Sequence, residues 1–426
     1  MNLASLSTCS KYSKFMAYDL DKDNNLDKIL RDYFGAEFFR PGINGLEDSF
    51  KVFNQIFQSK KIQIVTIAGT NGKGQTSHYL NDLLTKKGFK CALWTSPHVL
   101  SVTERFKFLG QYISHDVLLD TFNEVFKEDL SFSYYEFLFF CFCKICDSIE
   151  LDYIILEVGL GGRLDSVNML DADLTLLTSI SKDHEEYLGS ELKGILKEKL
   201  GVTRTHAFHV SALESLELRS AQYIELKNQK TDFVDLFENS FLNSEDDFSV
   251  RNQTLATFAY FKLMGLKVDR NLIGDMISRF ECSVTKGRQE EVTIGEIKFI
   301  FIGAHNIDGL RKTREYFLSQ NLNSKYEGLI CAFSKRPSED VEFGLSILET
   351  EPSPWKSIYV TEFEHTKAMP VDSFCVSERH TVTKDWQKLF LTIINKERGQ
   401  WIVTGSYYFI GEVQKYLIHR FNSMEL

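Results

Sequence analysis

The sequence predicts an α/β protein built on parallel sheets and divided into two domains. Short apolar runs rich in β-branched residues alternate with segments of helical periodicity, which is the pattern of strands joined by helical crossovers. The chain has 426 residues, too many for one compact core. A glycine-rich loop between one such strand and the following helix is the third indication.

The elements follow from these patterns in order. We expect strands at 62–68, 91–95, 153–158, 174–179, 297–302, 327–333, 357–361 and 401–404. We expect helices at 75–87, 116–127, 134–149, 252–264, 270–279, 308–319 and 408–420. The polar segment 281–291 precedes a second strand–helix alternation, so we place the domains at 1–284 and 285–426.

Composition and charge exclude several classes of protein. There are 49 basic and 59 acidic side chains, a net charge of −10, which does not favour nucleic acid or an anionic membrane surface. The longest apolar run, 137–143, is far shorter than the roughly 20 residues that span a bilayer, and residues 1–15 lack a signal-peptide core. The cysteines at 141–146 lie in an apolar helical run, so we expect buried packing and not a metal cluster. A reducing cytoplasm is the expected location.

The segment "IVTIAGTNGKGQT" at 64–76 has the form of a phosphate-binding loop. Its glycines allow backbone N–H groups to converge on phosphate oxygens, the helix start adds a positive dipole, and Lys73 adds a full charge. A plain glycine-rich turn is the alternative. Such loops usually have a Ser or Thr after the last lysine–glycine pair to ligate Mg²⁺, but here that position holds Gln75, and a hydroxyl follows only at Thr76.

Three other predicted strands end in polar side chains. Ser96 follows the strand at 91–95, Glu157 ends the strand at 153–158 before a glycine-rich loop, and His184 follows the strand at 174–179. Ligands of open parallel sheets bind at the carboxyl ends of the strands, and a carboxylate there is a good metal ligand. Taken singly, each has a structural alternative: a Ser-Pro turn, a solvated loop and a structural histidine. Lys199, on the next predicted helix, would by itself be a solvated lysine.

Taken together, these segments resemble the folylpolyglutamate synthase/dihydrofolate synthase family, a branch of the Mur-type peptide ligases. The resemblance runs from about residue 38 to residue 420 and rests on ten ordered segments. They are "RPGINGLEDS", "GTNGKGQT", "SPHVLSVTERF", "YYEF", "LEVGLGGRLDSVN", "DHEEYLG", "KEKLGV", "GRQE", "GAHN" and "VTGSYYFIGEV". The resemblance implies a P-loop domain of the Mur-ligase central type with a parallel sheet, then a Rossmann-like C-terminal domain, with ATP between them.

The resemblance also implies roles for individual residues. Nucleotide contacts fall on Thr70, Asn71, Gly72, Lys73, Gly74, Gln75, Thr76, Asn252, Arg288 and His305. A second Mg²⁺ would be held by Ser96, Glu157 and His184, with Lys199 as a carbamate that supplies further oxygens. The pterin-side pocket would be formed by Tyr134, Tyr135, Glu136, Leu164, Asp165 and Ser166. Lys73, His184, Lys199 and His305 would take part in catalysis.

The reaction that the resemblance implies is ATP-dependent amide formation. A folate-type carboxylate, from dihydropteroate or a folylpolyglutamate, would attack the γ-phosphate to give an acyl phosphate, which the amine of L-glutamate would then displace. ATP and two Mg²⁺ ions would be the cofactors, and we expect a monomer that binds neither nucleic acid nor membrane.

Several positions depart from the family pattern, all on the nucleotide side. Besides Gln75, Ile302 replaces an Asp associated with the ribose, Ile307 replaces a proline, and Lys286 stands where Pro is usual. A catalytically impaired folate- or nucleotide-binding relative, and a Mur-type ligase for another acceptor, therefore remain as alternatives to a working enzyme.

Overall fold

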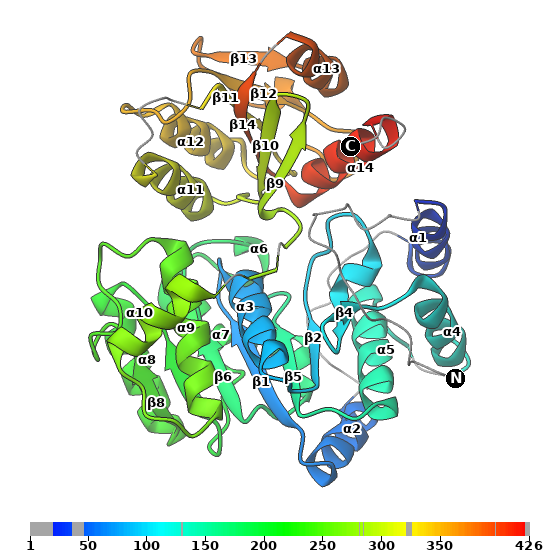
Figure 1. Cartoon of the computed structure of the whole chain (residues 1–426), viewed down its shortest axis with the longest axis vertical. Helices are drawn as coiled ribbons and strands as arrows, with labels where there is room; N and C mark the ends of the chain where they lie inside the picture. Colours follow the sequence, from blue (N-terminus) through cyan, green and yellow to red (C-terminus); the bar gives the residue numbers. More distant parts are fainter. Residues whose placement is uncertain are drawn as a thin grey trace.

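The computed structural model describes residues 20–35, 47–128, 131–280, 282–283, 285–320, 326–396 and 398–421. Two sheets organise these residues, an eight-stranded sheet in the first part of the chain and a six-stranded sheet in the second. Figure 1 shows the second sheet and its helices packed over one end of the first. The α/β fold class with parallel-rich sheets is confirmed.

The first sheet has the strand order β4-β3-β2-β5-β1-β6-β7-β8. Its strands are β1 (Gln63–Ala68), β2 (Cys91–Trp94), β3 (Phe106–Phe108), β4 (Gln111–Tyr112), β5 (Tyr153–Glu157), β6 (Leu174–Leu177), β7 (Phe208–Ser211) and β8 (Asp232–Asp235). β2, β5, β1, β6, β7 and β8 run parallel, and β3 and β4 form an antiparallel edge. The carboxyl ends of the central strands therefore meet at one edge.

Helices cover both faces of this sheet. They are α1 (Leu20–Phe34), α2 (Glu47–Ser59), α3 (Lys73–Lys86), α4 (His115–Val125), α5 (Tyr134–Ser148), α6 (Glu185–Leu188), α7 (Leu192–Leu200), α8 (Leu216–Gln229), α9 (Phe248–Leu263) and α10 (Arg270–Arg279). Short 3-10 turns are η1 (Val102–Arg105) and η2 (Ser166–Met169). Successive β1 side chains point to opposite faces, so Ile64 joins the core under α2 and α5 while Val65 joins the core under α3 and α9.

The second sheet has the order β13-β12-β11-β14-β10-β9, with only the β9–β10 pair antiparallel among the described strands. Its strands are β9 (Arg288–Ile294), β10 (Ile297–Ile302), β11 (Gly328–Ala332), β12 (Ile358–Thr361), β13 (His380–Thr383) and β14 (Gly399–Gly405). Its helices are α11 (Ile307–Ser319), α12 (Ser338–Glu349), α13 (Trp386–Lys396) and α14 (Tyr407–Phe421), with a 3-10 turn η3 (Val371–Ser373). Alternate β10 residues point to opposite faces, Phe299 and Phe301 toward α13 and α14, and Ile300 and Ile302 toward α11 and α12.

The strands and helices expected from the sequence are present, with ends that differ by a few residues. The cysteines of α5 are confirmed as buried packing residues: Cys141, Cys143 and Cys146 are free and fully buried. The "RPGING" segment (40–45) and Val284, at the expected domain boundary, lie outside the described residues. No helix in the described part of the chain is both long and apolar enough to cross a membrane.

One loop of the first part packs into the core of the second. Val99 and Leu100, just after β2, belong to the hydrophobic cluster of β10, β14 and α14. A side chain on Gly411 of α14 would come within 2.3 Å of the Val99 carbonyl oxygen, so a glycine is required for this close approach. Ser96 lies on the same loop, which ties the strand edge of the first sheet to the position of the second.

Candidate active site at the junction of the two sheets

The glycine loop after β1 is braced against the chain that follows β6. The Thr70 N–H donates to the Ser179 carbonyl (2.8 Å), the Asn71 N–H donates to Ser179 Oγ (2.9 Å), and Thr178 Oγ1 donates to the Asn71 carbonyl (2.7 Å). Gly72, with φ +90°, is the N-cap of α3. The loop thus places the first turn of α3 at the edge of the sheet, where free helix N–H groups and the helix dipole favour an anion.

Two lysine amines converge on this loop, from the half-buried Lys73 and the buried Lys199. Lys73 Nζ donates to the carbonyls of Gly69 (2.9 Å) and Thr70 (3.0 Å), and Lys199 Nζ, from α7, donates to Gly69 (3.0 Å). Burial lowers the pKa of Lys73, against the opposing effect of Glu157 and Asp183. Burial and then the neighbouring Lys73 charge lower the pKa of Lys199 to about 7. Lys199 is therefore a buried amine with access to its neutral, nucleophilic form, unlike the solvated lysine that its sequence alone suggests.

Ser96 and Glu157 come together at the ends of β2 and β5. The Ser96 N–H donates to Glu157 Oε2 (3.0 Å), and both residues are buried. Arg288, at the start of β9, lies 3.5 Å from Glu157 Oε1 and donates from Nη2 to the Ser96 carbonyl (3.4 Å). Its guanidinium also lies on the loop, because a side chain on Gly74 would come within 1.8 Å of Arg288 Nη1. The second sheet thus contributes a cation to the same edge.

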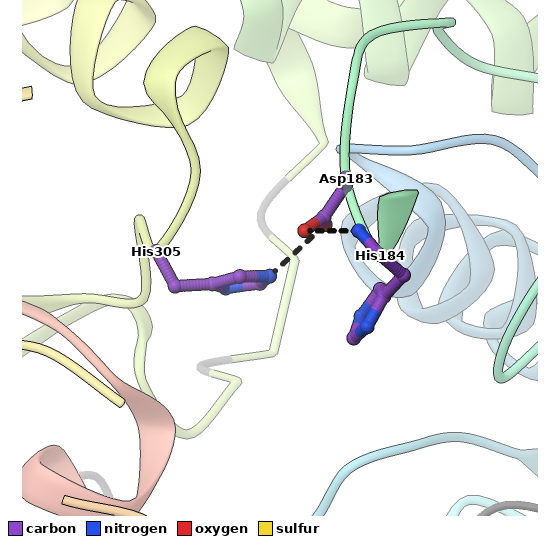
Figure 2. Close-up of side chains that lie close together, drawn as sticks. All are labelled: Asp183, His184 and His305. Atoms are coloured by element: carbon purple, nitrogen blue, oxygen red, sulfur yellow. Dashed lines mark hydrogen bonds and ion pairs between the residues drawn. The ribbon is translucent and has the colours of Figure 1, made fainter. Parts of the chain in front are cut away.

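His184 lies with Asp183 and His305 (Figure 2). The ligand atoms of these three side chains are all within 4.8 Å of one another, and His305 Nε2 is 3.2 Å from Asp183 Oδ2. No hydrogen bond or ion pair among the described residues joins His184 to Ser96 or Glu157. Burial lowers the pKa of His184, although the neighbouring Asp183 carboxylate opposes the shift.

A polar network joins the glycine loop to the start of α11. Asn71 Nδ2 donates to Asp308 Oδ2 (2.8 Å) and Asn306 Oδ1 (3.2 Å), and Asn306 Nδ2 donates to Asp183 Oδ2 (2.9 Å). Asn306 is also the N-cap of α11 through the Gly309 N–H (2.8 Å). The sequence places Asp183 beside His184 at this edge, whereas Asn306 and Asp308 were not assigned to the site, because a contact between the two sheets brings them there.

Gln75 occupies the position where such loops usually have a hydroxyl. Both the oxygen and the nitrogen of its side-chain amide are hydrogen-bonded. Its Oε1 accepts from Asn252 Nδ2 (2.7 Å), and its Nε2 donates to Ser249 Oγ (3.0 Å) and approaches Gln289 Oε1 (3.4 Å). The helix begins at Lys73, and Thr76, in its first turn, is fully buried. The Thr76 hydroxyl has no hydrogen-bond partner among the described residues. Gln75 therefore links α3 to α9 and β9.

The residues expected at the pterin-side pocket have structural partners. Glu136 accepts the Ser133 N–H (2.6 Å) in the capping box of α5, and Asp165 accepts the N–H groups of Leu160 (2.8 Å) and Val167 (3.0 Å). Burial raises the pKa of Asp165 to about 6, although these bonds oppose the rise. The others lie nearby in α5 and the loop before η2: Tyr134 and Ser166 are buried, and Tyr135 and Leu164 are half-buried. Gly159 packs on the Tyr135 ring, so the two segments are in contact.

No protein-family model matches the chain. A dihydrofolate synthase/folylpolyglutamate synthase of Buchnera aphidicola (subspecies Baizongia pistaciae) is 28% identical over 391 residues, which cover 86% of this chain and 89% of the relative. Escherichia coli FolC in complex with DHPP and ADP has the same fold, with a TM-score of 0.74 at 20% identity over 93% of this chain and 98% of that one. A bifunctional folylpolyglutamate synthase/dihydrofolate synthase with Mn, AMPPNP and L-glutamate bound gives 0.73 at 22% identity over 91% and 96%.

The chain is thus similar to dihydrofolate synthases/folylpolyglutamate synthases over most of its length. The positions where it departs from the pattern of this family have local explanations. Ile302 is buried in the cluster of α11 and α12, and Ile307 is the first residue of α11, where a proline would need no N–H partner and where Asn306 supplies the cap. Lys286 pairs with the buried Glu290 (2.5 Å), which also accepts the Gly287 N–H (3.0 Å).

The donors at this edge fit a hard divalent cation such as the Mn that one of these solved structures holds. Glu157 and Ser96 offer a carboxylate and a hydroxyl on neighbouring strands, the oxygen ligands that Mg²⁺ and Mn²⁺ prefer. Glu157 is buried, and the cation that pairs with it is Arg288, at 3.5 Å. A metal ion and Arg288 would therefore share one carboxylate.

Proposed function

We propose that this chain is an ATP-dependent ligase that joins L-glutamate to a folate-type carboxylate through an acyl phosphate. The observation that carries the proposal is the convergence of a glycine loop, Lys73, the buried Lys199 and Glu157 at the junction of the two sheets. The relatives named above support it, because they are dihydrofolate and folylpolyglutamate synthases, and solved members bind ADP or AMPPNP, Mn and L-glutamate.

Some of these residues bind the nucleotide, and others hold the cations that compensate its charge. The amides of Gly72, Lys73 and Gly74, with the Lys73 amine, bind the β- and γ-phosphates, while Thr70 and Asn71 hold the loop against Ser179. Arg288 and His305 approach the nucleotide from the second sheet. Bound divalent cations offset negative charge on the transferring phosphoryl group. Ser96, Glu157, His184 and a carbamylated Lys199 are the proposed ligands, with two metal sites in all. Gln75 and Thr76 lie beside the phosphates, and Asn252 beside Gln75.

In this proposal the folate-type acceptor lies at the strand edge of the first sheet, on the side away from the nucleotide. Its carboxylate attacks the γ-phosphorus and ADP leaves; the glutamate amine then attacks the acyl carbon, and phosphate leaves. Contact between the two sheets excludes water, which would otherwise hydrolyse the acyl phosphate. Tyr134, Tyr135, Glu136, Leu164, Asp165 and Ser166 form the pterin-side wall. Part of the same proposal is a cytoplasmic monomer, with residues 1–284 as the ATP-binding domain and residues 285–426 as the second domain.

ADP release tests the proposal. Purified protein with ATP and Mg²⁺ should release ADP only when L-glutamate and either dihydropteroate or a reduced folate are both present, and a Lys73→Met variant should not. ADP release that is independent of glutamate, or equal in the variant, would contradict it. Binding of nucleotide and folate without turnover would identify an impaired relative, and turnover with another acceptor would identify a different Mur-type ligase.

A further inference from the structure

Asp183, His184 and His305 form a second group of potential metal ligands, distinct from the Ser96–Glu157 pair. Asp183 and His184 follow β6 in the first sheet, whereas His305 follows β10 in the second, and Figure 2 shows the three side chains together. The His184 backbone has φ +51° and ψ +44°, a left-handed conformation that is uncommon for a residue other than glycine. Such strain persists where the surrounding structure requires it, and it concentrates at ligand sites.

The carboxylate at the centre of this group is held in place. Asp183 Oδ2 accepts from Asn306 Nδ2 (2.9 Å) and pairs with His305 Nε2 (3.2 Å), and Asp183 Oδ1 accepts the His184 N–H (3.1 Å). His305 Nδ1 is buried without a hydrogen-bond partner among the described residues. A guanidinium also lies close by, because Arg336 Nη1 donates to the His305 carbonyl. A bound dication would therefore depend on Asp183 for charge compensation.

The distances suit a small ion. A point at the centre of a triangle with 4.8 Å sides lies roughly 2.8 Å from each corner, so movements of about 0.7 Å bring each ligand atom to the roughly 2.1 Å of a zinc bond. Rotation of side chains alone supplies movements of that size. Two imidazoles and one carboxylate are donors for Zn²⁺, Co²⁺ or Ni²⁺, whereas Mg²⁺ prefers oxygen ligands throughout.

We propose that Asp183, His184 and His305 form a site for a transition-metal dication such as Zn²⁺, which links the two sheets when it binds. The ion would take His184 and His305 away from the roles proposed above, and it would hold the second sheet in place against the glycine loop. Transition metal would therefore inhibit the ligase. This last consequence rests on the proposed function, but binding of the ion does not.

The test is direct titration of the purified protein with Zn²⁺ against a chromophoric chelator, without substrates and in excess Mg²⁺. The exposed thiols Cys282 and Cys375, and Cys9 outside the described residues, should be replaced by serine, because they would bind zinc on their own. In this background we expect one Zn²⁺ per chain. His305→Gln and Asp183→Asn each remove one ligand and should weaken Zn²⁺ binding by at least about 100-fold. This is the upper end of the loss in affinity seen when a residue that only hydrogen-bonds a metal ligand is replaced.

The matched control is His206→Gln, an exposed histidine before β7, at the opposite edge of the first sheet. It should bind Zn²⁺ as the parent does. His184→Gln, at an exposed position, provides a third ligand variant that should fold even if a buried substitution does not. Equal Zn²⁺ affinity in the parent and all three ligand variants, or loss of binding in Mg²⁺ excess, would overturn the proposal. Zn²⁺ binding with loss in the ligand variants would uphold it even in a protein without ligase activity.

Discussion

The low pKa of Lys199 predicts that this residue reacts with CO₂ near neutral pH. Its amine is buried, donates to the Gly69 carbonyl (3.0 Å) and has a pKa of about 7, lowered by burial and by Lys73. At pH 8 such an amine is about 90% uncharged, whereas one with the ordinary pKa near 10.5 is only about 0.3% uncharged. Because only the neutral amine attacks CO₂, Lys199 should form a carbamate about 300 times more readily than a surface lysine.

Carbon-13 NMR of the protein in ¹³C-bicarbonate measures this carbamate directly. We expect one slowly exchanging carbamate signal per chain at pH 8, which weakens as the pH falls through about 7 because the amine becomes protonated. Lys199→Arg keeps the charge and should lose the signal. Lys199→Ala should be inactive, with partial rescue by short carboxylates that supply the missing oxygens. A signal of equal size in Lys199→Arg, or none in the parent at pH 8, would refute the reasoning.

Four further substitutions give clear expectations. Glu157→Gln should lower kcat by about 100-fold or more while leaving the melting temperature within a few degrees, since it removes charge at the edge and not packing; activity within a few-fold of the parent would remove Glu157 from the metal site. Gln75→Ser should lower the Mg²⁺ concentration needed for half-maximal rate, although it breaks the hydrogen bond to Asn252. An unchanged Mg²⁺ requirement, together with an inactive Thr76→Ala variant, would instead assign the Mg²⁺-ligating hydroxyl to Thr76. Ile302→Asp should destabilise the protein by about 3 kcal/mol or more in urea, because it puts a charge into an apolar cluster; unchanged stability with tighter ATP binding would indicate a ribose contact instead. Phe139→Ala, in the fully buried aromatic cluster of α5, should cost about 3–5 kcal/mol with little effect on KM for ATP; a loss under 1 kcal/mol would show that the core relaxes around the cavity.

Local sequence patterns predict much of the fold and of the strand edge, because both depend on short stretches of chain. Alternating apolar runs place β1, β5 and β6, and the residues that follow them, Glu157 and His184 among them, meet at one edge as parallel strands require. Edge strands were harder to predict. β3 and β4 have three and two residues, and strands so short have no clear periodicity.

Contacts between the two sheets could not be predicted, because no local pattern encodes how the two parts pack. The approach of Gln75 to Gln289, and that of His305 to Asp183, join residues that are 122 or more positions apart. Some local signals pointed to a structural role beside the functional one. Ser133 and Glu136 have the spacing of a capping box, and the carboxylate assigned to the pterin side does cap α5.

Isotope transfer tests the central claim, ligation through an acyl phosphate, most directly. The acceptor carboxylate is labelled with ¹⁸O, the reaction is run with ATP, Mg²⁺ and L-glutamate, and the released phosphate is examined by ³¹P NMR. Attack of the carboxylate on the γ-phosphorus leaves one ¹⁸O in the phosphate for each amide formed. We expect this one-to-one transfer, and loss of both products in Lys73→Met. Phosphate without ¹⁸O, released in step with amide formation, would contradict the account.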